Sequence, residues 1–319
     1  MMKKTFYYPY SEYLKKTYGE KVYKLPINLP VTCPNRLGRQ KGCTFCAESG
    51  TGFEALSSEV RVTEQLLNTR SLIEKKYHAH KFIAYFQNYT NTFMKIERFR
   101  AYIEEAARVP DIVEIAVSTR PDCIRGEYLE ALKETTTAGG QRVTVELGLP
   151  TANYHTLQKI QRGHSLAEFI DAVLEIKKYG FDICAHVILN LPGDTMEDAK
   201  ETAKILSALG IDIVKIHSLY IAKNTLLCEA YENGTITICS KEEYLQRLQV
   251  FLEFLNPDIA VERLFSRIPE EEAVFCNWET SWWKLKDEFE EKMRADGSFQ
   301  GKRFRYLKGA ALEKLEAVY

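Results

Sequence analysis

The feature of this sequence that most constrains its fold is a repeated pattern: an apolar, β-branched run followed by an amphipathic helical stretch. The runs begin about thirty residues apart, which is the length of one strand–helix unit. They lie at residues 81–87, 111–119, 142–149, 181–191 and 211–220. Near-continuous runs of Val, Ile and Leu are typical of strands buried on both faces, so the pattern predicts a parallel sheet covered by helices.

Helical segments with apolar residues three and four positions apart alternate with these runs. The helices are expected at residues 63–77, 96–108, 127–136, 166–179 and 195–209, and an earlier strand at 25–31. No GxGxxG sequence follows the first strand, which argues against a dinucleotide-binding fold. We therefore expect an α/β fold, a partial (β/α)6 TIM-like barrel with a small C-terminal α/β extension. In such barrels the chemistry gathers at the carboxyl ends of the strands.

The same pattern divides the chain into three expected parts. Residues 1–24 form a basic N-terminal extension, 25–225 the partial barrel, and 226–319 a C-terminal extension packed on the barrel. The extension begins with a helical stretch at 241–255 and a short apolar run at 259–264.

Composition excludes several classes of protein. The chain has 319 residues, of which 45% are hydrophobic and 27% charged, as in ordinary globular proteins and unlike disordered ones. No apolar run approaches the roughly 18 residues that a membrane helix needs. The N-terminus has lysines but no apolar segment typical of a signal peptide, so we expect a cytoplasmic protein without membrane contact.

Charge is distributed unevenly along the chain. The formal net charge is −1, yet residues 1–41 contain nine Lys and Arg side chains against Glu12 and Glu20. A basic segment of this kind can bind a polyanion even in a nearly neutral protein. The alternative is a lysine-rich end that is merely solvated.

Three of the eight cysteines lie together, in a C-x9-C-x2-C pattern formed by Cys33, Cys43 and Cys46. Reduced thiols are expected in a chain without a secretory signal, so a disulfide framework is disfavoured. Three thiolates on one glycine-containing loop favour an iron–sulfur cluster with one open iron. A structural zinc ion normally takes four protein ligands, and no fourth Cys or His lies nearby. Zinc and three unrelated cysteines remain the alternatives.

The cysteine loop and five later segments together resemble the radical S-adenosylmethionine (SAM) superfamily. The segments are YFQNYTNT (85–92), STRPD (118–122), ELGL (146–149), KIQRGHS (159–165) and HVILNLPGDT (186–195). Over residues 20–225 the chain is similar to the bacterial YtqA/YhcC-type members, which are related to the catalytic subunit of elongator. The resemblance implies a [4Fe-4S] cluster whose open iron chelates SAM. With an electron from a donor such as flavodoxin or ferredoxin, SAM is cleaved to methionine and a 5′-deoxyadenosyl radical, which removes a hydrogen atom from the substrate.

The resemblance also implies roles for single residues. Cys33, Cys43 and Cys46 hold the cluster that cleaves SAM, Phe45 lies beside the adenine, and Arg162 contacts the carboxylate end of SAM. The other residues expected to bind the cofactor lie where predicted strands end. For those with amide or hydroxyl side chains, the alternative role is to form turns. These residues are Gln87, Asn88, Thr90, Asn91, Ser118, Arg120 and Glu146. Pro150 replaces a family glutamine, so either Ser118 or a backbone group contacts the ribose, or SAM binds more weakly to this chain.

The relation to elongator implies tRNA as the substrate. We expect the chain to edit an existing C5 substituent of the wobble uridine, such as carboxymethylaminomethyluridine, which would become aminomethyluridine. Basic and aromatic residues alternate near the C-terminus, a pattern typical of single-stranded RNA binding, at Lys302, Arg303, Phe304, Arg305, Tyr306 and Lys308. The alternatives are a radical SAM enzyme acting on a small molecule or peptide, and a nucleic-acid-binding protein with a structural metal.

Overall fold

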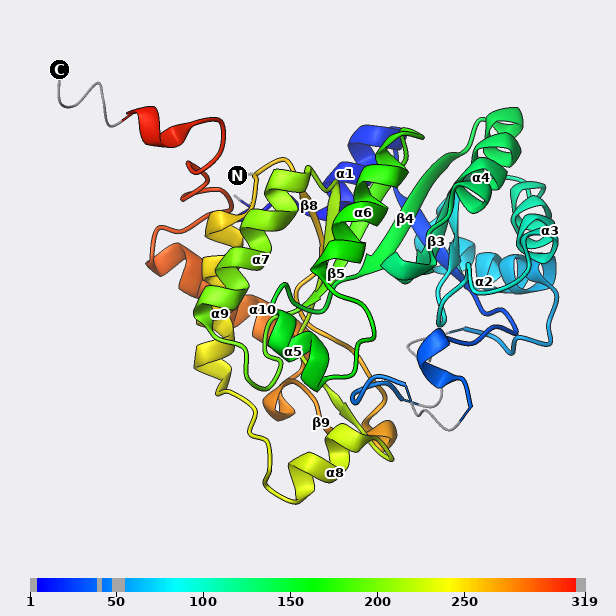
Figure 1. The fold of residues 1–319 in the computed structure, drawn as a ribbon. Helices are drawn as coiled ribbons and strands as arrows, with labels where there is room; N and C mark the ends of the chain where they lie inside the picture. The colour runs from blue at the N-terminus through cyan, green and yellow to red at the C-terminus, as the bar shows by residue number, and fades with distance from the viewer. Residues whose placement is uncertain (1–4, 39–41, 48–54, 314–319) are drawn as a thin grey trace.

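Seven parallel strands form one curled sheet in the computed structural model, which describes residues 5–38, 42–47 and 55–313 (Figure 1). The strands are β1 (Val22–Ile27), β2 (Lys81–Phe86), β3 (Ile112–Thr119), β4 (Arg142–Gly148), β5 (Asp182–Ile188), β6 (Ile213–His217) and β8 (Ala260–Arg263). Their order in the sheet follows their order in the chain. A separate antiparallel pair consists of β7 (Ile221–Ala222) and β9 (Ala273–Phe275).

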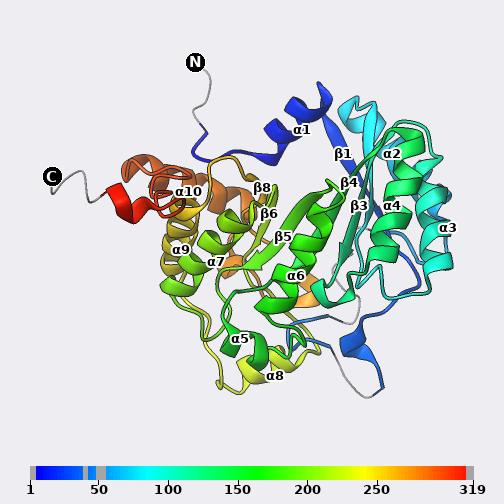
Figure 2. The ribbon, with the colours of Figure 1, turned by 45° about the horizontal axis from the view of Figure 1, so that its top comes forward.

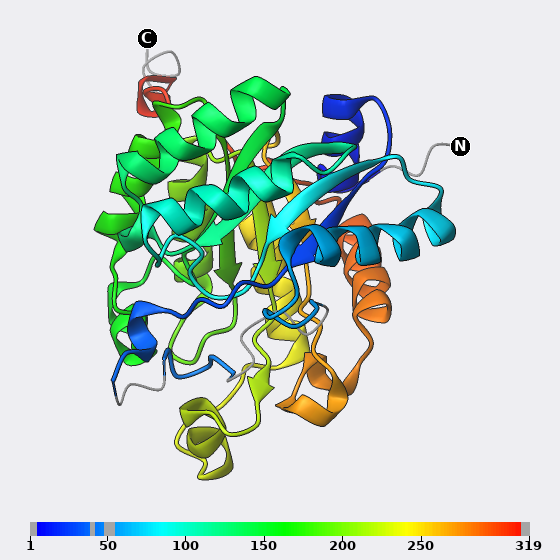
Figure 3. The same ribbon diagram turned by 90° about the vertical axis from the view of Figure 1, so that its right-hand side faces the viewer.

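Helices cover the outer face of the sheet, and those at Val62–Tyr77, Ile96–Ala107 and Gly126–Gly139 lie over its first strands (Figure 3). The helices are α1 (Tyr10–Tyr18), α2 (Val62–Tyr77), α3 (Ile96–Ala107), α4 (Gly126–Gly139), α5 (Tyr154–Lys159), α6 (Leu166–Lys177), α7 (Met196–Leu209), α8 (Leu226–Glu232), α9 (Lys241–Phe254) and α10 (Trp282–Ala295). Short 3-10 turns lie at Pro34–Arg36, Pro121–Cys123, Glu270–Glu272, Asn277–Glu279 and Ala310–Leu312. Within the described ranges, none of these helices has the length and apolar character needed to span a membrane.

Both faces of the sheet are buried, as the apolar runs predict. Along β2, Phe82, Ala84 and Phe86 belong to the main core beneath the outer helices, whereas Ile83 and Tyr85 belong to a second core inside the barrel. This alternation is the two-residue period of a strand. The predicted α/β partial barrel is therefore confirmed.

Helix α1 closes the amino-terminal end of the barrel. Tyr10 and Leu14 pack into the inner core, the Tyr13 hydroxyl donates to Asp182 Oδ2 at 2.9 Å, and the Tyr18 hydroxyl donates to Glu114. These tyrosine rings therefore contribute to the fold and pack against the inner core. Lys15 remains exposed on the outer side of the same helix.

The strand near residue 260 is the main difference from the expected arrangement. It joins the barrel sheet as β8, parallel to β6, with Ala260 opposite Ile213. The C-terminal extension thus supplies part of the inner wall of the barrel. β1 begins at Val22, before the expected start at residue 25. The proposed domain boundaries stay predictions.

Candidate active site

A cavity of about 220 Å³ opens among the carboxyl ends of the strands and the loop that follows β1. This is the edge of a parallel barrel at which catalytic side chains normally gather. Ten of the residues predicted from the sequence line it: Cys33, Cys43, Phe45, Cys46, Gln87, Thr90, Ser118, Arg120, Glu146 and Arg162. The structure thus brings together groups that lie more than a hundred residues apart in the chain.

The cysteine loop is fixed to the loop that follows α5. The Asn35 side-chain amide donates to the carbonyl oxygens of Gln161, at 2.9 Å, and Arg162, at 2.8 Å. The Cys46 amide donates to the Cys43 carbonyl at 3.0 Å, which closes the C-x-x-C segment into a turn. Two distant parts of the sequence therefore hold the three thiols at one end of the cavity.

Three guanidinium groups surround the cysteines. Arg120 Nη1 lies 3.8 Å from Cys33 Sγ, and Arg162 Nη1 lies 3.6 Å from Cys43 Sγ. Arg36 donates to the Cys46 carbonyl at 3.0 Å. Burial raises the pKa of the Cys46 thiol, and the nearby Arg36 opposes that shift. Cationic donors beside three thiols fit an anionic iron–sulfur cluster.

Two glycines allow the loops to approach closely. A Cβ atom at Gly148 would lie 2.4 Å from Arg162 Nη2, and one at Gly163 would lie 2.4 Å from Asn35 Oδ1. Gly163 also has a φ of +77°, which favours glycine. The absence of a side chain at Gly148 and Gly163 therefore leaves the space in which Arg162 lies beside the cysteine loop.

Arg162 and Arg120 form a connected pair. Arg162 Nη2 donates to the Gly148 carbonyl at 3.0 Å, and Arg162 Nε has no partner within the described residues. Arg120 is bidentate to Asp122, at 2.8 and 2.7 Å, and donates to the Arg162 carbonyl at 2.9 Å. Because Arg120 is paired with Asp122 and Arg162 has no carboxylate partner in the described structure, Arg162 is the better anion-binding group.

The polar segment after β2 divides into two roles. Gln87 and Thr90 line the cavity, whereas Asn88 and Asn91 are buried and are not part of its lining. The Asn91 amide donates to the carbonyls of Phe86, Asn88 and Ser118. For Asn91, these bonds favour the turn-forming alternative over contact with a cofactor.

Inside the barrel, two lysines and two glutamates form a buried ionic network. Lys24 Nζ lies 2.6 Å from Glu146 Oε1 and 2.7 Å from Glu262 Oε2, and Lys215 Nζ lies 2.9 Å from Glu262 Oε1. Tyr85 also donates to Glu146, at 2.9 Å. Burial alone raises the pKa of Glu146, but Lys215 and Lys24 outweigh it and hold the pKa well below its usual range. The carboxylate is therefore ionised and fully partnered.

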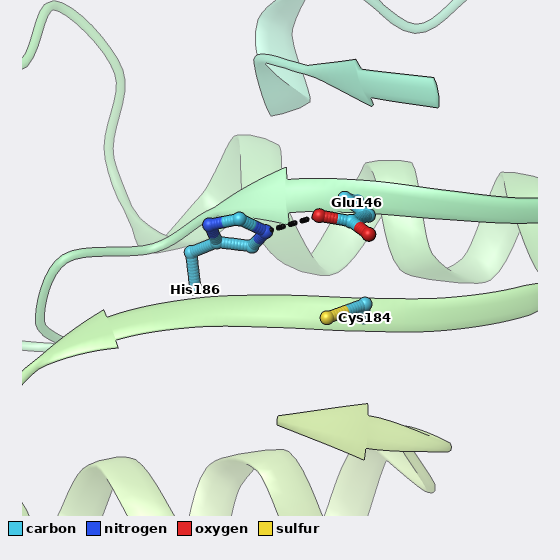
Figure 4. A group of neighbouring side chains, drawn as sticks. All are labelled: Glu146, Cys184 and His186. Atoms are coloured by element: carbon cyan, nitrogen blue, oxygen red, sulfur yellow. Dashed lines mark hydrogen bonds and ion pairs between the residues drawn. The ribbon is translucent and has the colours of Figure 1, made fainter. Parts of the chain in front are cut away.

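Glu146, Cys184 and His186 lie close enough to be considered as a metal site (Figure 4). His186 Nε2 donates to Glu146 Oε2 at 2.7 Å, and burial lowers the pKa of His186, so the imidazole is neutral. Burial raises the pKa of the Cys184 thiol well above its usual value, so it is not a thiolate. Since two ammonium groups already neutralise this region, the group does not fit a cation and is part of the ionic network.

Several residues of the cavity and of the ionic network were missed from the sequence. Lys24 and Lys215 interrupt apolar strands, and an isolated charge within such a strand is a signal that could have identified them. Arg263 and Arg267 also line the cavity. Their position depends on how β8 joins the sheet, for which the sequence gives no direct signal.

The predicted RNA-binding cluster lies away from the cysteine loop. Gln300, just before it, donates to the Ile259 carbonyl at 2.8 Å, next to the amino end of β8. This is the opposite edge of the sheet from the carboxyl ends of the strands, where the cavity lies. Figure 2 shows the C-terminal segment beside α10. Arg303 is paired with Glu253 at 2.8 Å, and the Tyr306 hydroxyl donates to the Phe254 carbonyl at 2.6 Å. The exposed basic residues are Lys302, Arg303, Arg305 and Lys308, and the rings of Phe304 and Tyr306 are half-buried.

Comparison with known proteins supports one assignment. The family model for the radical SAM superfamily matches residues 27–206, and the model for the radical SAM C-terminal domain matches residues 211–295. The uncharacterized protein YtqA of Bacillus subtilis is 32% identical, covering 94% of each chain. A tRNA uridine(34) acetyltransferase of Methanocaldococcus infernus is 27% identical over 182 residues, which is 54% of this chain and 33% of that protein.

The fold is also shared with a solved structure. Archaeal Elp3 of Methanocaldococcus infernus superposes with a TM-score of 0.68 and 18% identity, covering 88% of this chain and 64% of that one. Enzymes of the radical SAM superfamily use a [4Fe-4S] cluster and SAM, and the cysteine loop described above has the donor set for the cluster. The chain belongs to the radical SAM superfamily and is a radical SAM enzyme.

Proposed function

We propose that this radical SAM enzyme modifies tRNA at the C5 substituent of the wobble uridine, converting carboxymethylaminomethyluridine to aminomethyluridine. The observation that carries the proposal is the 27% identity over 182 residues with a protein named tRNA uridine(34) acetyltransferase. The shared fold with Elp3 and the arginine-rich cavity are compatible with it.

The proposed conversion is chemically balanced. The cofactors, when bound, supply reductive cleavage of SAM and a radical able to abstract hydrogen. The methylene between the nitrogen and the carboxylate of the substituent has a weak C–H bond. Loss of two electrons and two protons there gives an imine, which water hydrolyses to aminomethyluridine and glyoxylate. Reductive cleavage of one SAM to methionine and 5′-deoxyadenosine consumes two electrons, so no further oxidant is needed.

The residues of the cavity have separable proposed roles. Cys33, Cys43 and Cys46 hold the cluster, and Arg162, beside Cys43 Sγ, binds the carboxylate of SAM. Phe45 packs beside the adenine. The remaining proposed cofactor contacts are Gln87, Thr90, Ser118 and Arg120, all of which line the cavity.

Pro150 lines the same cavity and cannot supply the side-chain amide that the family glutamine offers. Its carbonyl accepts the Ile188 amide at 2.8 Å, which fixes the backbone at this position. The Ser118 hydroxyl donates to Tyr85 Oη at 3.2 Å and can also accept a hydrogen bond. We propose that Ser118 contacts the ribose of SAM in place of the glutamine.

The proposed function also involves contacts with RNA and with an electron donor outside the cavity. The exposed basic residues of the C-terminal cluster, Lys302 to Lys308, bind RNA phosphates, and Phe304 supplies a ring for stacking. A flavodoxin or ferredoxin delivers the electron.

Nucleoside mass spectrometry of total tRNA tests the proposed function. A strain lacking the gene is expected to accumulate carboxymethylaminomethyluridine and to lose aminomethyluridine and its derivatives. The wild-type gene restores the modification, and a Cys33→Ala copy does not. An unchanged nucleoside profile in a strain that normally contains these nucleosides would overturn the proposal and favour a small molecule or peptide as substrate.

A further inference from the structure

Arg263 lines the same cavity as the cysteine loop. It is half-buried, and its side chain has no hydrogen bond or ion pair within the described residues. Its neighbours in the lining include His217, Tyr220 and Ser266, which are uncharged or weakly polar. A guanidinium that is partly removed from water without a carboxylate partner is costly unless a ligand supplies the anion.

A β-bulge places Arg263 there. Val214 pairs with Val261, but the next residue, Lys215, pairs with Arg263, so Glu262 is an additional residue in β8. As a result two consecutive side chains are available to the interior: Glu262 reaches Lys24 and Lys215, while Arg263 lines the cavity. Bulges of this kind commonly re-aim a side chain beside an active site.

The surrounding charges do not neutralise Arg263. The ammonium groups of Lys24 and Lys215 already balance the carboxylates of Glu146 and Glu262. Burial holds the pKa of His217 well below its usual value, with His186 and Arg263 adding to the shift, so this neighbour is a neutral imidazole. The positive charge of Arg263 therefore remains available to a ligand.

We propose that Arg263 is a specificity-determining residue that binds the carboxylate of the substrate's substituent. A guanidinium matches a carboxylate with two parallel N–H···O bonds, which a lysine cannot reproduce. This inference rests on the proposed function, because that function supplies a substituent ending in a carboxylate. The same chemistry could also be met by a backbone phosphate, and the experiment separates the two sources.

Equilibrium binding of two synthetic anticodon stem-loops tests the inference without requiring turnover. One carries carboxymethylaminomethyluridine, and the other carries its neutral carboxamide at the same position. The wild-type protein is expected to bind the carboxylate RNA about tenfold more tightly, as a charge-assisted pair allows. Arg263→Gln should abolish this preference by weakening only the carboxylate RNA. Arg263→Lys should retain part of it.

Controls make each result decisive. The control variant Arg98→Gln, on the exposed side of α3, should keep the wild-type preference for the carboxylate RNA. An unchanged iron content and melting temperature verify that Arg263→Gln is folded. No preference in the wild type, or equal weakening of both RNAs by Arg263→Gln, would overturn the inference; the second result would assign Arg263 to a phosphate. If the preference depends on Arg263 but the RNA is never converted, the inference stands and the proposed reaction fails.

Discussion

Arg162 lies where the cysteine loop, the end of β4 and the segment after α5 meet. Its guanidinium is 3.6 Å from Cys43 Sγ and 3.0 Å from the Gly148 carbonyl, and Nε has no partner in the described structure. A cation held in this way, next to a proposed cluster ligand, is placed to bind an anionic group that approaches the proposed cluster. This is the structural basis for assigning it to the carboxylate of SAM.

Replacing Arg162 should therefore weaken SAM binding. We expect Arg162→Ala to raise the Kd for SAM by about tenfold to a hundredfold, as for the loss of a hydrogen bond to a charged group. Calorimetry with anaerobically reconstituted protein measures the change, and Arg98→Ala serves as the control. An Arg162→Ala variant that retains its iron and binds SAM normally would show that the pocket is placed wrongly.

The sequence was most informative for residues that belong to a contiguous motif. The spacing of Cys33, Cys43 and Cys46 and the QRGH segment containing Arg162 led directly to groups that the structure brings together. Arg263 could not be identified in this way, because its orientation depends on a bulge created by pairing with a distant strand. Asn91 was assigned to the cofactor site as a polar residue of a resembling segment at a predicted strand end, whereas its side-chain amide donates to three backbone carbonyls.

At the scale of elements, the ionic network joins β1, β4, β6 and β8 inside the barrel. Replacing Glu146 by Gln would leave the buried ammonium of Lys215 with a weaker set of partners. We expect Glu146→Gln to lower the free energy of unfolding by about 3 kcal/mol, as when one partner of a buried pair is removed. Glu134→Gln, which breaks an exposed pair with Arg100, should cost less than about 1 kcal/mol. Denaturant unfolding of both variants makes the comparison, and equal losses would contradict the proposed role of the network.

The stacked imidazoles of His186 and His217, at the ends of β5 and β6, should make stability depend on pH. Burial lowers the pKa of both side chains, so the unfolded chain binds protons that the folded chain excludes. Stability should accordingly be highest above about pH 6.5 and fall as the pH decreases below it. His217→Gln should reduce this slope by up to about 1.4 kcal/mol per pH unit. Unfolding curves between pH 5 and 7.5 measure it, and an unchanged slope would mean that His217 is protonated in the folded protein.

The positions of the strands and outer helices along the chain could be predicted well from the sequence. The contacts between elements distant in the sequence could be predicted less well. Apolar periodicity located the strands and outer helices to within a few residues, because each buries one side against the main core. The roles of α1 and β8 were not evident, because both depend on long-range pairing. Tyr13 reaches Asp182 on β5, and Ala260 pairs with Ile213 on β6. Local sequence patterns contain no information about such distant partners.

At the scale of the whole molecule, the two ends of the barrel differ in structure. The amino end is closed by α1 and flanked by the C-terminal segment, and the carboxyl end contains the cavity with its arginines. If RNA also binds the C-terminal cluster, it must extend along the side of the barrel while the wobble base enters the cavity.

Charge reversal tests that extended path. Lys302→Glu combined with Arg305→Glu changes two exposed residues and leaves the Arg303–Glu253 pair intact. We expect tRNA binding to weaken and its dependence on salt to decrease by about one unit of log–log slope for each phosphate that the variant no longer binds. The matched control is Arg98→Glu with Lys133→Glu, which makes the same charge change on α3 and α4. Identical binding by the C-terminal variant and the wild type would restrict the RNA-binding surface to the cavity edge.

The central claim is that the chain removes a hydrogen atom from the substituent of a wobble uridine. The most direct measurement uses an anticodon stem-loop whose carboxymethylaminomethyluridine contains deuterium in the methylene next to the carboxylate. After reaction with reconstituted protein, SAM and a reductant, we predict 5′-deoxyadenosine carrying one deuterium together with aminomethyluridine in the RNA. Unlabelled 5′-deoxyadenosine and an unchanged nucleoside, from protein that holds its cluster and cleaves SAM, would contradict the account.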